Sequence, residues 1–210
     1  MKNGLIESAN GDKEWYLNDQ LHREDGPAIE HANGNKSWHL NGQLHREDGP
    51  AVERADGNKE WWKNDQRHRE YGPASEFING DKVWYLDNQL HREDGPAIEF
   101  ADGTKHWYLN GQIHREDGPA TEFPDGTWEW HLNGQPHRED GPAAQFADGS
   151  KRWYLNGQLL IPVTKVTMVN SKTEDKPSPG DLAKDEINNP LLITTVLGDA
   201  DQGYYIAFLK

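Results

Sequence analysis

A 23-residue segment, repeated without insertion or deletion, makes up most of this chain. One copy, residues 89–111, reads QLHREDGPAIEFADGTKHWYLNG. A structural ladder of tryptophans marks the period, and its members are Trp15, Trp38, Trp61, Trp84, Trp107, Trp130 and Trp153. A His-Arg pair keeps the same step six times, beginning at His22, His45, His68, His91, His114 and His137. Such a fixed period is typical of a repeat array, in which each unit buries its apolar face on its neighbours.

The composition fits such an array and narrows the class of protein. Only 33% of the 210 residues are hydrophobic, which is lean for a globule with a central core. There is no cysteine, so a disulfide framework and thiolate chemistry are excluded. The first residues lack the apolar core of a signal peptide, and no run approaches the ~18 apolar residues of a membrane span. We therefore expect a soluble, cytoplasmic protein.

Each repeat contains two dipeptides that favour tight turns, Asp102-Gly103 and Asn110-Gly111 in the copy above. Asn, Asp and Gly tolerate the positive φ angles of type I′ hairpin turns, so we expect this turn type at both places. The segments between them, such as residues 97–100 and 105–109, are short and rich in β-branched or aromatic residues, with no helical period. The sequence predicts an all-β fold, an elongated antiparallel sheet of tandem β-hairpin repeats, with about seven 23-residue units and a small C-terminal capping region.

A turn centred on Asp102 and Gly103 predicts the register of the hairpin, with Phe100 opposite Lys105 and Ile98 opposite Trp107. The face expected to pack then contains Ile98, Phe100, Trp107 and Leu109. The opposite face contains Ala97, Glu99, His106 and Tyr108. Burial of ~200 Å² of tryptophan is worth up to ~5 kcal/mol, whereas a surface ion pair gives ~0 to 1 kcal/mol. We therefore expect the tryptophans to hold the array together.

The two ends of the array differ from its interior. Gly4–Glu7 occupies the place of Gly-Pro-Ala-Ile-Glu, so the array begins with the second half of a repeat. The seventh HRED position reads LIPV at residues 160–163, and the chain becomes apolar there. We divide the chain into an array at residues 1–159 and a region at residues 160–210. This region is either a cap on the last repeat or an element for homo-oligomerisation or partner docking. Within it, residues 181–187 are compatible with a turn or two of helix.

The HRED motif combines an imidazole, a guanidinium and two carboxylates, as catalytic sites do. Because an active site is rarely built six times over, we interpret the motif as structural. Arginine would pair with Glu or Asp between adjacent units, and histidine would pack beside the tryptophans. Equivalent histidines should lie two strands apart, about 10 Å, whereas the ligands of one zinc ion lie within ~4 Å of one another. The turns also lack the pattern of a calcium loop. We expect no enzymatic activity, no metal and no cofactor.

The chain is acidic, with a net charge of −14. Residues 160–210 contain five Lys and seven Asp or Glu, so −12 of that charge belongs to the array. Such a surface repels nucleic-acid phosphates and anionic lipid, so we expect no direct binding to nucleic acid or membrane. A basic protein partner would suit it.

Acidic and aromatic residues are predicted to share one sheet face, and we take this face as the candidate binding surface. Its members are Glu30, Glu53, Glu76, Glu99 and Glu122 with Tyr16, Trp62, Tyr85, Tyr108 and Tyr154. A merely solvated sheet face is the alternative interpretation. The leading hypothesis is a non-catalytic protein-binding or scaffold module. The second is an acidic inhibitor or decoy, of viral or mobile-element origin, that blocks a nucleic-acid-binding host protein.

The layout of the repeat resembles MORN repeats, in which an aromatic residue, a glycine and a His-Gly-x-Gly run recur at this period. Trp107, Gly111, His114, Gly118 and Gly103 occupy comparable positions, and their counterparts extend over about 150 residues. Here Arg-Glu-Asp-Gly-Pro follows the histidine, so the array resembles the divergent variants of bacterial and viral proteins. The resemblance implies stacked hairpins used for protein contacts or scaffolding. The WYLNGQ segments also resemble choline- and glucan-binding repeats, which implies carbohydrate or cell-wall binding as a weaker alternative.

Overall fold

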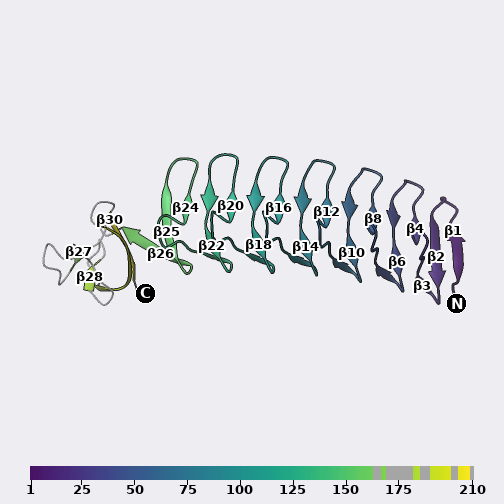
Figure 1. The fold of residues 1–210 in the computed structure, drawn as a ribbon, viewed down its shortest axis with the longest axis horizontal. Coiled ribbons are helices and arrows are strands. Elements are labelled where there is room, and N and C mark those ends of the chain that lie inside the picture. Colours follow the sequence, from purple (N-terminus) through teal and green to yellow (C-terminus); the bar gives the residue numbers. More distant parts are fainter. Residues whose placement is uncertain (163–166, 169–181, 185–189, 200–202, 209–210) are drawn as a thin grey trace. The chain divides into compact units, whose positions relative to one another are not determined.

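The computed structural model describes residues 1–162, 167–168, 182–184, 190–199 and 203–208. The chain divides into two units, Met1–Gln112 and Ile113–Lys210, and each is described by itself. Every regular element in the described ranges is a β-strand, and the strands pair as consecutive antiparallel hairpins (Figure 1). The predicted all-β fold of tandem hairpins is therefore confirmed. In the same ranges, no helix has the length and apolar character needed to cross a membrane.

The first unit contains a long ladder of strands, two from each repeat. In ladder order they are β1 (Gly4–Glu7), β2 (Lys13–Leu17), β4 (Ile29–Glu30), β5 (Lys36–Ser37), β8 (Val52–Glu53), β9 (Lys59–Glu60), β12 (Ser75–Glu76), β13 (Lys82–Val83), β16 (Ile98–Glu99) and β17 (Lys105–His106). Each strand pairs antiparallel with the next. The predicted half-repeat at the N-terminus is strand β1, which pairs with β2.

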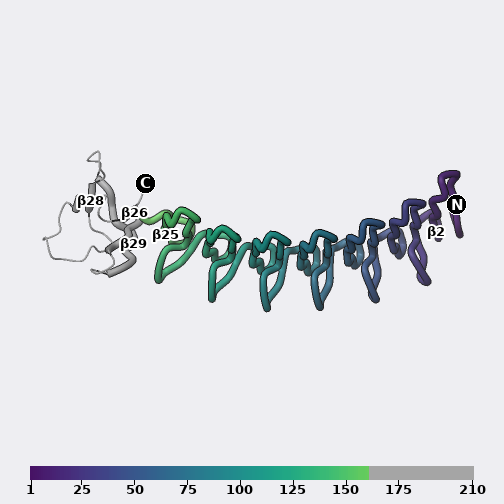
Figure 2. Tube along the Cα trace, turned by 90° about the horizontal axis from the view of Figure 1, so that it is seen from above, coloured from purple at the N-terminus to yellow at the C-terminus, as the bar shows by residue number. Residues whose placement is uncertain are grey.

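A second, shorter hairpin follows in each repeat. In the first unit these hairpins are β2 with β3 (Gln20–Leu21), β6 (His39–Leu40) with β7 (Gln43–Leu44), β10 (Trp62–Lys63) with β11 (Gln66–Arg67), and β14 (Tyr85–Leu86) with β15 (Gln89–Leu90). Strands β18 (Tyr108–Leu109) and β19 (Gln112–Ile113) follow in the chain. Seen from above, each repeat of the first unit presents the same pair of loops (Figure 2).

The second unit contains the same two kinds of hairpin and the C-terminal strands. Its strands are β20 (Thr121–Glu122), β21 (Trp128–Glu129), β22 (His131–Leu132), β23 (Gln135–Pro136), β24 (Ala144–Gln145), β25 (Lys151–Leu155), β26 (Gln158–Pro162), β27 (Thr167–Met168), β28 (Leu182–Lys184), β29 (Pro190–Asp199) and β30 (Gly203–Phe208). Strand β26 pairs with β25 on one side and with β30 on the other, so backbone hydrogen bonds join the C-terminal strands to the last hairpin. The predicted boundary between residues 159 and 160 falls inside β26.

The structure tests only part of what was expected of residues 160–210. The predicted turn of helix is wrong at Leu182–Lys184, which is strand β28, and the rest of residues 181–187 lies outside the described residues. Strand β28 pairs with β29, which in turn pairs with β30. The role of this region as a cap or as an oligomerisation element stays a prediction.

The two turns of each repeat are of different types, and sequence analysis assigned only one of them correctly. At Asn110 and Gly111, φ is 50° and 76°, as a type I′ turn requires, and the equivalent pair of every other repeat has the same signs. At the first turn only Gly103 has a positive φ, 94°. The Gly103 amide donates to the Phe100 carbonyl, and the Phe100 amide donates to the Thr104 carbonyl. This is a three-residue loop that ends in a glycine bulge.

The extra loop residue makes the predicted register wrong. Ile98 is paired with His106, not with Trp107. A shift of one residue changes which side chains of the two strands share a face. The prediction that Phe100 lies on the packed face, with Ala97 on the opposite one, is also wrong. Phe100 is 39% exposed and Ala97 is completely buried.

The predicted aromatic strand is interrupted at the tryptophan. Trp84 lies between β13 and β14, where its amide donates to the Ala97 carbonyl at 2.8 Å and its carbonyl accepts from the His91 amide at 3.2 Å. The backbone therefore leaves the long ladder and enters the short hairpin at this residue. Only at Trp15 and Trp153 does one strand, β2 or β25, run through the tryptophan without a break.

The centre of each repeat is the alanine of Gly-Pro-Ala. In the first unit the exposed fraction of Ala28, Ala51, Ala74 and Ala97 is 0%, and in the second unit it is 0% at Ala120 and 1% at Ala143. The tryptophans of the structural ladder are half-buried. The array is thus packed around small side chains, with tryptophan and arginine stacked beside them.

Candidate functional site

The arginine of each HRED motif is the organising residue of its loop. In the loop of Arg92, Nε donates to Asp94 at 2.8 Å, and Nη1 donates to the Pro96 carbonyl at 3.1 Å and to Glu99 at 2.8 Å. The guanidinium carbon lies 4.1 Å from the centroid of the Trp84 ring, in cation–π contact. The aspartate contact recurs at Arg23, Arg46, Arg115 and Arg138, and the stacking recurs at Arg23, Arg46, Arg69 and Arg138.

The glycine after HRED is required by the arginine. A Cβ atom on Gly95 would lie 2.9 Å from the guanidinium carbon of Arg92, a distance that real Cβ contacts do not show. The φ of Gly95 is not in the positive region, so the close approach and not the turn geometry explains this residue. The guanidinium therefore lies between a tryptophan ring and a bare Cα.

The glutamates of the predicted binding face are partly used within the repeat. Glu30, Glu53, Glu76 and Glu99 accept from the arginine seven residues before them at 3.3, 3.2, 2.9 and 2.8 Å. Glu122 makes the same contact with Arg115 at 3.1 Å. The prediction that arginine and carboxylate pair between adjacent units is wrong for these contacts, since both partners belong to one 23-residue segment.

The aromatic members of that face lie on other strands. Trp62, Tyr85 and Tyr108 begin the short strands β10, β14 and β18, whereas the glutamates lie on the long-ladder strands and on β20. Tyr16 and Tyr154 lie on the continuous strands β2 and β25. All five aromatic side chains are half-buried. The break at each tryptophan thus divides the predicted face between two kinds of hairpin.

Histidine links successive short hairpins, a role that sequence analysis did not assign. His91 follows the β14–β15 hairpin, and its Nδ1 accepts from the backbone amide of Asn110 at 3.2 Å, in the type I′ turn between β18 and β19. The equivalent bond is made by His22, His68, His114 and His137, and Nδ1 of His45 lies 2.8 Å from Oδ1 of Asn64. A neutral imidazole that accepts at Nδ1 carries its proton on Nε2. In His91 this atom lies 3.8 Å from the Glu93 carboxylate.

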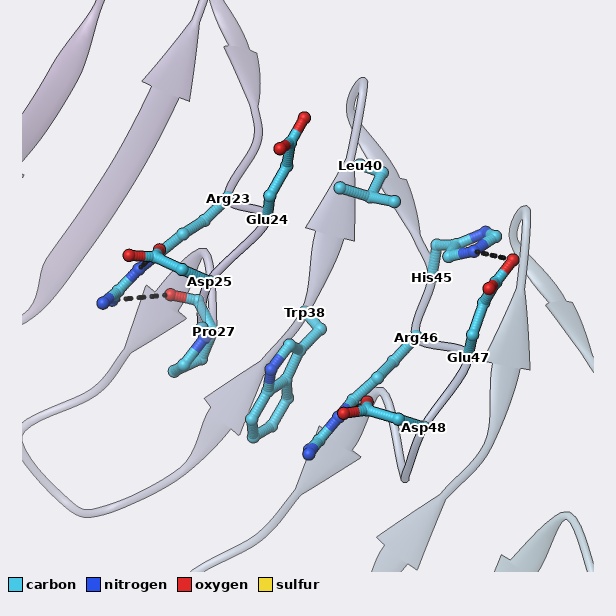
Figure 3. Close-up of a pocket in the computed structure, with 11 residues that line it drawn as sticks. Arg23, Glu24, Asp25, Pro27, Trp38, Leu40, His45, Arg46, Glu47 and Asp48 are labelled. Atoms are coloured by element: carbon cyan, nitrogen blue, oxygen red, sulfur yellow. Dashed lines mark hydrogen bonds and ion pairs between the residues drawn. The ribbon is translucent and has the colours of Figure 1, made fainter.

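Between successive HRED loops of the first unit lies a row of grooves. Loop groove 1 is bounded by the loops of Arg23 and Arg46, loop groove 2 by the loops of Arg46 and Arg69, and loop groove 3 by the loops of Arg69 and Arg92. Figure 3 shows groove 1, in which Trp38 lies between the two loops with the Arg46 guanidinium beside its ring. Trp61 and Trp84 take the same place in grooves 2 and 3.

The rims of groove 1 present carboxylates, because its arginines turn inward. The side chains of Glu24 and Asp25 are both 86% exposed, and those of Glu47 and Asp48 are 82% and 83% exposed. Arg23, by contrast, is 23% exposed and is already paired with Asp25. Hydrogen bonds and charge from the arginines hold the pKa values of Asp25 and Asp48 below their ordinary range, so both carboxyls stay ionised. Such a groove suits a cation with an apolar stem.

Comparison with known proteins identifies no relative of the chain, so the proposed function is argued from this site alone. The chain matches no protein-family model, and a search of curated proteins found no match. The likeness to MORN repeats therefore stays a resemblance in the layout of the sequence.

Proposed function

We propose that this array is a non-catalytic binding module that holds a basic, extended polypeptide across its loop grooves. The observation that carries the proposal is the combination, in one groove, of four exposed carboxylates with a tryptophan. In the HRED motif itself, the arginine and histidine are engaged in contacts that hold the repeats in shape. The exposed glutamate of each loop, and the exposed aspartate of every loop except the third, are the groups left to meet a partner.

The grooves favour lysine or arginine side chains for two reasons. The carboxylates attract the cationic head, and the tryptophan offers an apolar surface to the methylene stem and a π-face to the charge. Each exposed ion pair contributes only ~0.2 to 1 kcal/mol, so one groove binds weakly. A partner that occupies several grooves at once gains affinity by multivalency, and its binding should fall steeply with salt.

The spacing of the grooves limits the conformation of the partner. Each repeat adds two strands to the long ladder, so equivalent groups are about 10 Å apart. A polyproline II helix rises ~3.1 Å per residue with three residues per turn, so every third side chain lies on the same side at ~9.3 Å intervals. In a β-strand, side chains on one side are ~6.6 Å apart. A polyproline II segment with a basic residue at every third position therefore matches the spacing of the grooves.

The proposal is tested with a fluorescein-labelled peptide of sequence (Lys-Pro-Pro)4 in an anisotropy titration. We expect saturable binding that weakens with salt. The triple substitution Glu24→Gln, Glu47→Gln and Glu93→Gln neutralises groove rims, and it should weaken binding about tenfold. The matched control, Glu7→Gln with Glu14→Gln and Glu129→Gln, removes the same number of charges from the net −14 but lies outside the grooves. Equal losses in the two variants would show that only net charge matters, and no binding at low salt would refute the proposal.

A further inference from the structure

The third HRED loop departs from the other copies at two positions, and both face the same groove. Tyr71 stands where the other loops have Asp25, Asp48, Asp94, Asp117 and Asp140. Lys63 stands where the other repeats have Leu17, Leu40, Leu86, Leu109, Leu132 and Leu155. Lys63 lines loop groove 2, where Leu40 and Leu86 line grooves 1 and 3. Tyr71 lines groove 2 and also the neighbouring groove 3. The two changes therefore occur together only in groove 2.

These two residues are free to meet a ligand. The side chain of Tyr71 is 87% exposed, and Lys63 is also exposed. Within residues 1–162, neither the Lys63 ammonium nor the Tyr71 hydroxyl has a hydrogen bond or ion pair in the structure. The other unusual cations of this repeat are compensated: Arg54 and Arg67 both bond to the buried carboxylate of Glu60, at 2.9 and 3.3 Å. Packing therefore explains Arg54 and Arg67 but not Lys63 or Tyr71.

The changes alter the chemistry of the groove. Groove 1 is lined by Glu24, Asp25, Glu47 and Asp48 against Arg23 and Arg46, a net charge of −2 with His45 neutral. Groove 2 is lined by Glu47, Asp48 and Glu70 against Arg46, Lys63 and Arg69, a net charge of zero. It also holds two aromatic rings, Trp61 and Tyr71, where groove 1 holds one. A lysine side chain of the partner is therefore attracted less strongly to groove 2 than to groove 1.

We infer that groove 2 takes an aromatic side chain of the partner and so fixes the register in which a basic segment lies on the row. A ring in this groove can stack on Tyr71 and receive the Lys63 ammonium on its face. Groove 1 has four carboxylates against two arginines and groove 3 has three against two, so both keep a net negative charge and take the flanking cations. The segment recognised has the pattern basic-x-x-aromatic-x-x-basic in polyproline II conformation. This inference rests on the proposed function, because it assumes that the grooves hold one continuous segment.

The test compares three labelled heptapeptides, Lys-Pro-Pro-X-Pro-Pro-Lys with X as Trp, Lys or Ala, at one salt concentration. The native protein should bind the Trp peptide about two- to fivefold more tightly than the Lys or Ala peptide. The double variant Lys63→Leu with Tyr71→Asp restores the residues found in the other repeats, so it should fold, and it should prefer the Lys peptide. Lys63→Leu alone should lose the preference for Trp. Adding Leu86→Lys should restore it and is the matched control, because groove 3, which Tyr71 also lines, then has the three carboxylates, three cations and two rings of groove 2.

The outcomes separate this inference from the proposed function. Equal affinity of the native protein for all three peptides, or an unchanged preference in the double variant, would overturn the register-setting role while leaving the basic partner in place. Failure of the native protein and of the double variant to bind any of the peptides, together with failure of (Lys-Pro-Pro)4, would refute both. A preference for Trp that is lost in Lys63→Leu and restored when Leu86→Lys is added would support the inference directly.

Discussion

The guanidinium carbon of Arg69 lies 3.8 Å from the centroid of the Trp61 ring, although the loop of Arg69 has a tyrosine in place of the usual aspartate. Arg69 also keeps its bonds to the Pro73 carbonyl and to Glu76, both at 2.9 Å. The aspartate is therefore not needed to hold the arginine on its tryptophan.

Stability should accordingly depend on the arginine far more than on the aspartate. We expect Arg92→Lys to lower the free energy of unfolding by about 1 to 3 kcal/mol, because lysine has no planar fork to bond Pro96 and Glu99 while stacking on Trp84. Asp94→Ala should change stability little, since its side chain is 84% exposed. Urea unfolding followed by tryptophan fluorescence gives both values, and an Asp94 variant that loses as much as the Arg92 variant would contradict this assignment.

Gly95→Ala should destabilise the array through the arginine and not through the backbone. The added methyl would lie 2.9 Å from the Arg92 guanidinium carbon and would push it off the Trp84 ring. The measurement is a double-mutant cycle with Arg92→Ala. If the contact is the cause, Gly95→Ala will cost much less in the Arg92→Ala background than in the native protein. Additive losses would place the cause in the backbone.

The alanine at the centre of each repeat should not tolerate a larger side chain. Ala97 is completely buried, so Ala97→Val is expected to cost about 1 to 3 kcal/mol by overpacking. Ala101, which is exposed in the neighbouring loop, is the matched control, and Ala101→Val should be nearly neutral. Melting temperatures that decrease equally in the two variants would show that there is room for a larger side chain at Ala97.

Trp84→Ala should cost about 3 kcal/mol, because it removes the ring on which Arg92 stacks together with half-buried apolar surface. His91→Ala should cost less, since it removes one hydrogen bond, to the Asn110 amide. Equilibrium unfolding of the two variants at neutral pH ranks them. The opposite order would mean that the histidine bond to the next short hairpin outweighs the stacking of arginine on tryptophan.

Two histidines should make stability depend on pH. Burial lowers the pKa of His39 and His131 below the ordinary value of 6.5, so both are neutral in the folded chain. As the pH falls, these histidines bind protons in the unfolded chain before they do so in the folded chain. Their effect on the free energy of unfolding is therefore absent well above pH 6.5, and below it they lower that free energy. Replacing both with tyrosine, which occupies the equivalent places at Tyr16 and Tyr85, should reduce the loss between pH 7.5 and 5. Melting curves at the two pH values test this, and an unchanged slope would contradict it.

The sequence predicted the period, the all-β class and the type I′ turns, because these depend on local residue preferences repeated in every copy. It did not predict the register, because Asp-Gly serves both a two-residue turn and a three-residue loop with a bulge. The difference at Asp102-Gly103 lies in whether the Phe100 amide bonds across to Thr104, which no pattern of residue types reveals.

The grooves were missed for a related reason. The motif showed that arginine and carboxylates occur together, but not that Arg23 turns inward while Glu24 and Asp25 remain exposed. The glycine after the motif was given no role, although at Gly26 it leaves room for the guanidinium. The departures at Lys63 and Tyr71 were visible in the sequence as exceptions to the repeat. Only the structure shows that they line one groove.

The histidine bond between successive short hairpins gives the array a direction and a rule of growth. Each histidine bonds forward by 19 residues, to the turn of the short hairpin that follows it, as His91 does to Asn110. Duplication of a whole 23-residue segment keeps this spacing for every histidine, whereas an insertion of another length between a histidine and its turn changes it. Copy number can therefore change during evolution, or by design, only in whole steps. Under the proposed function, each step adds one groove and lengthens the segment that the array recognises by about three residues.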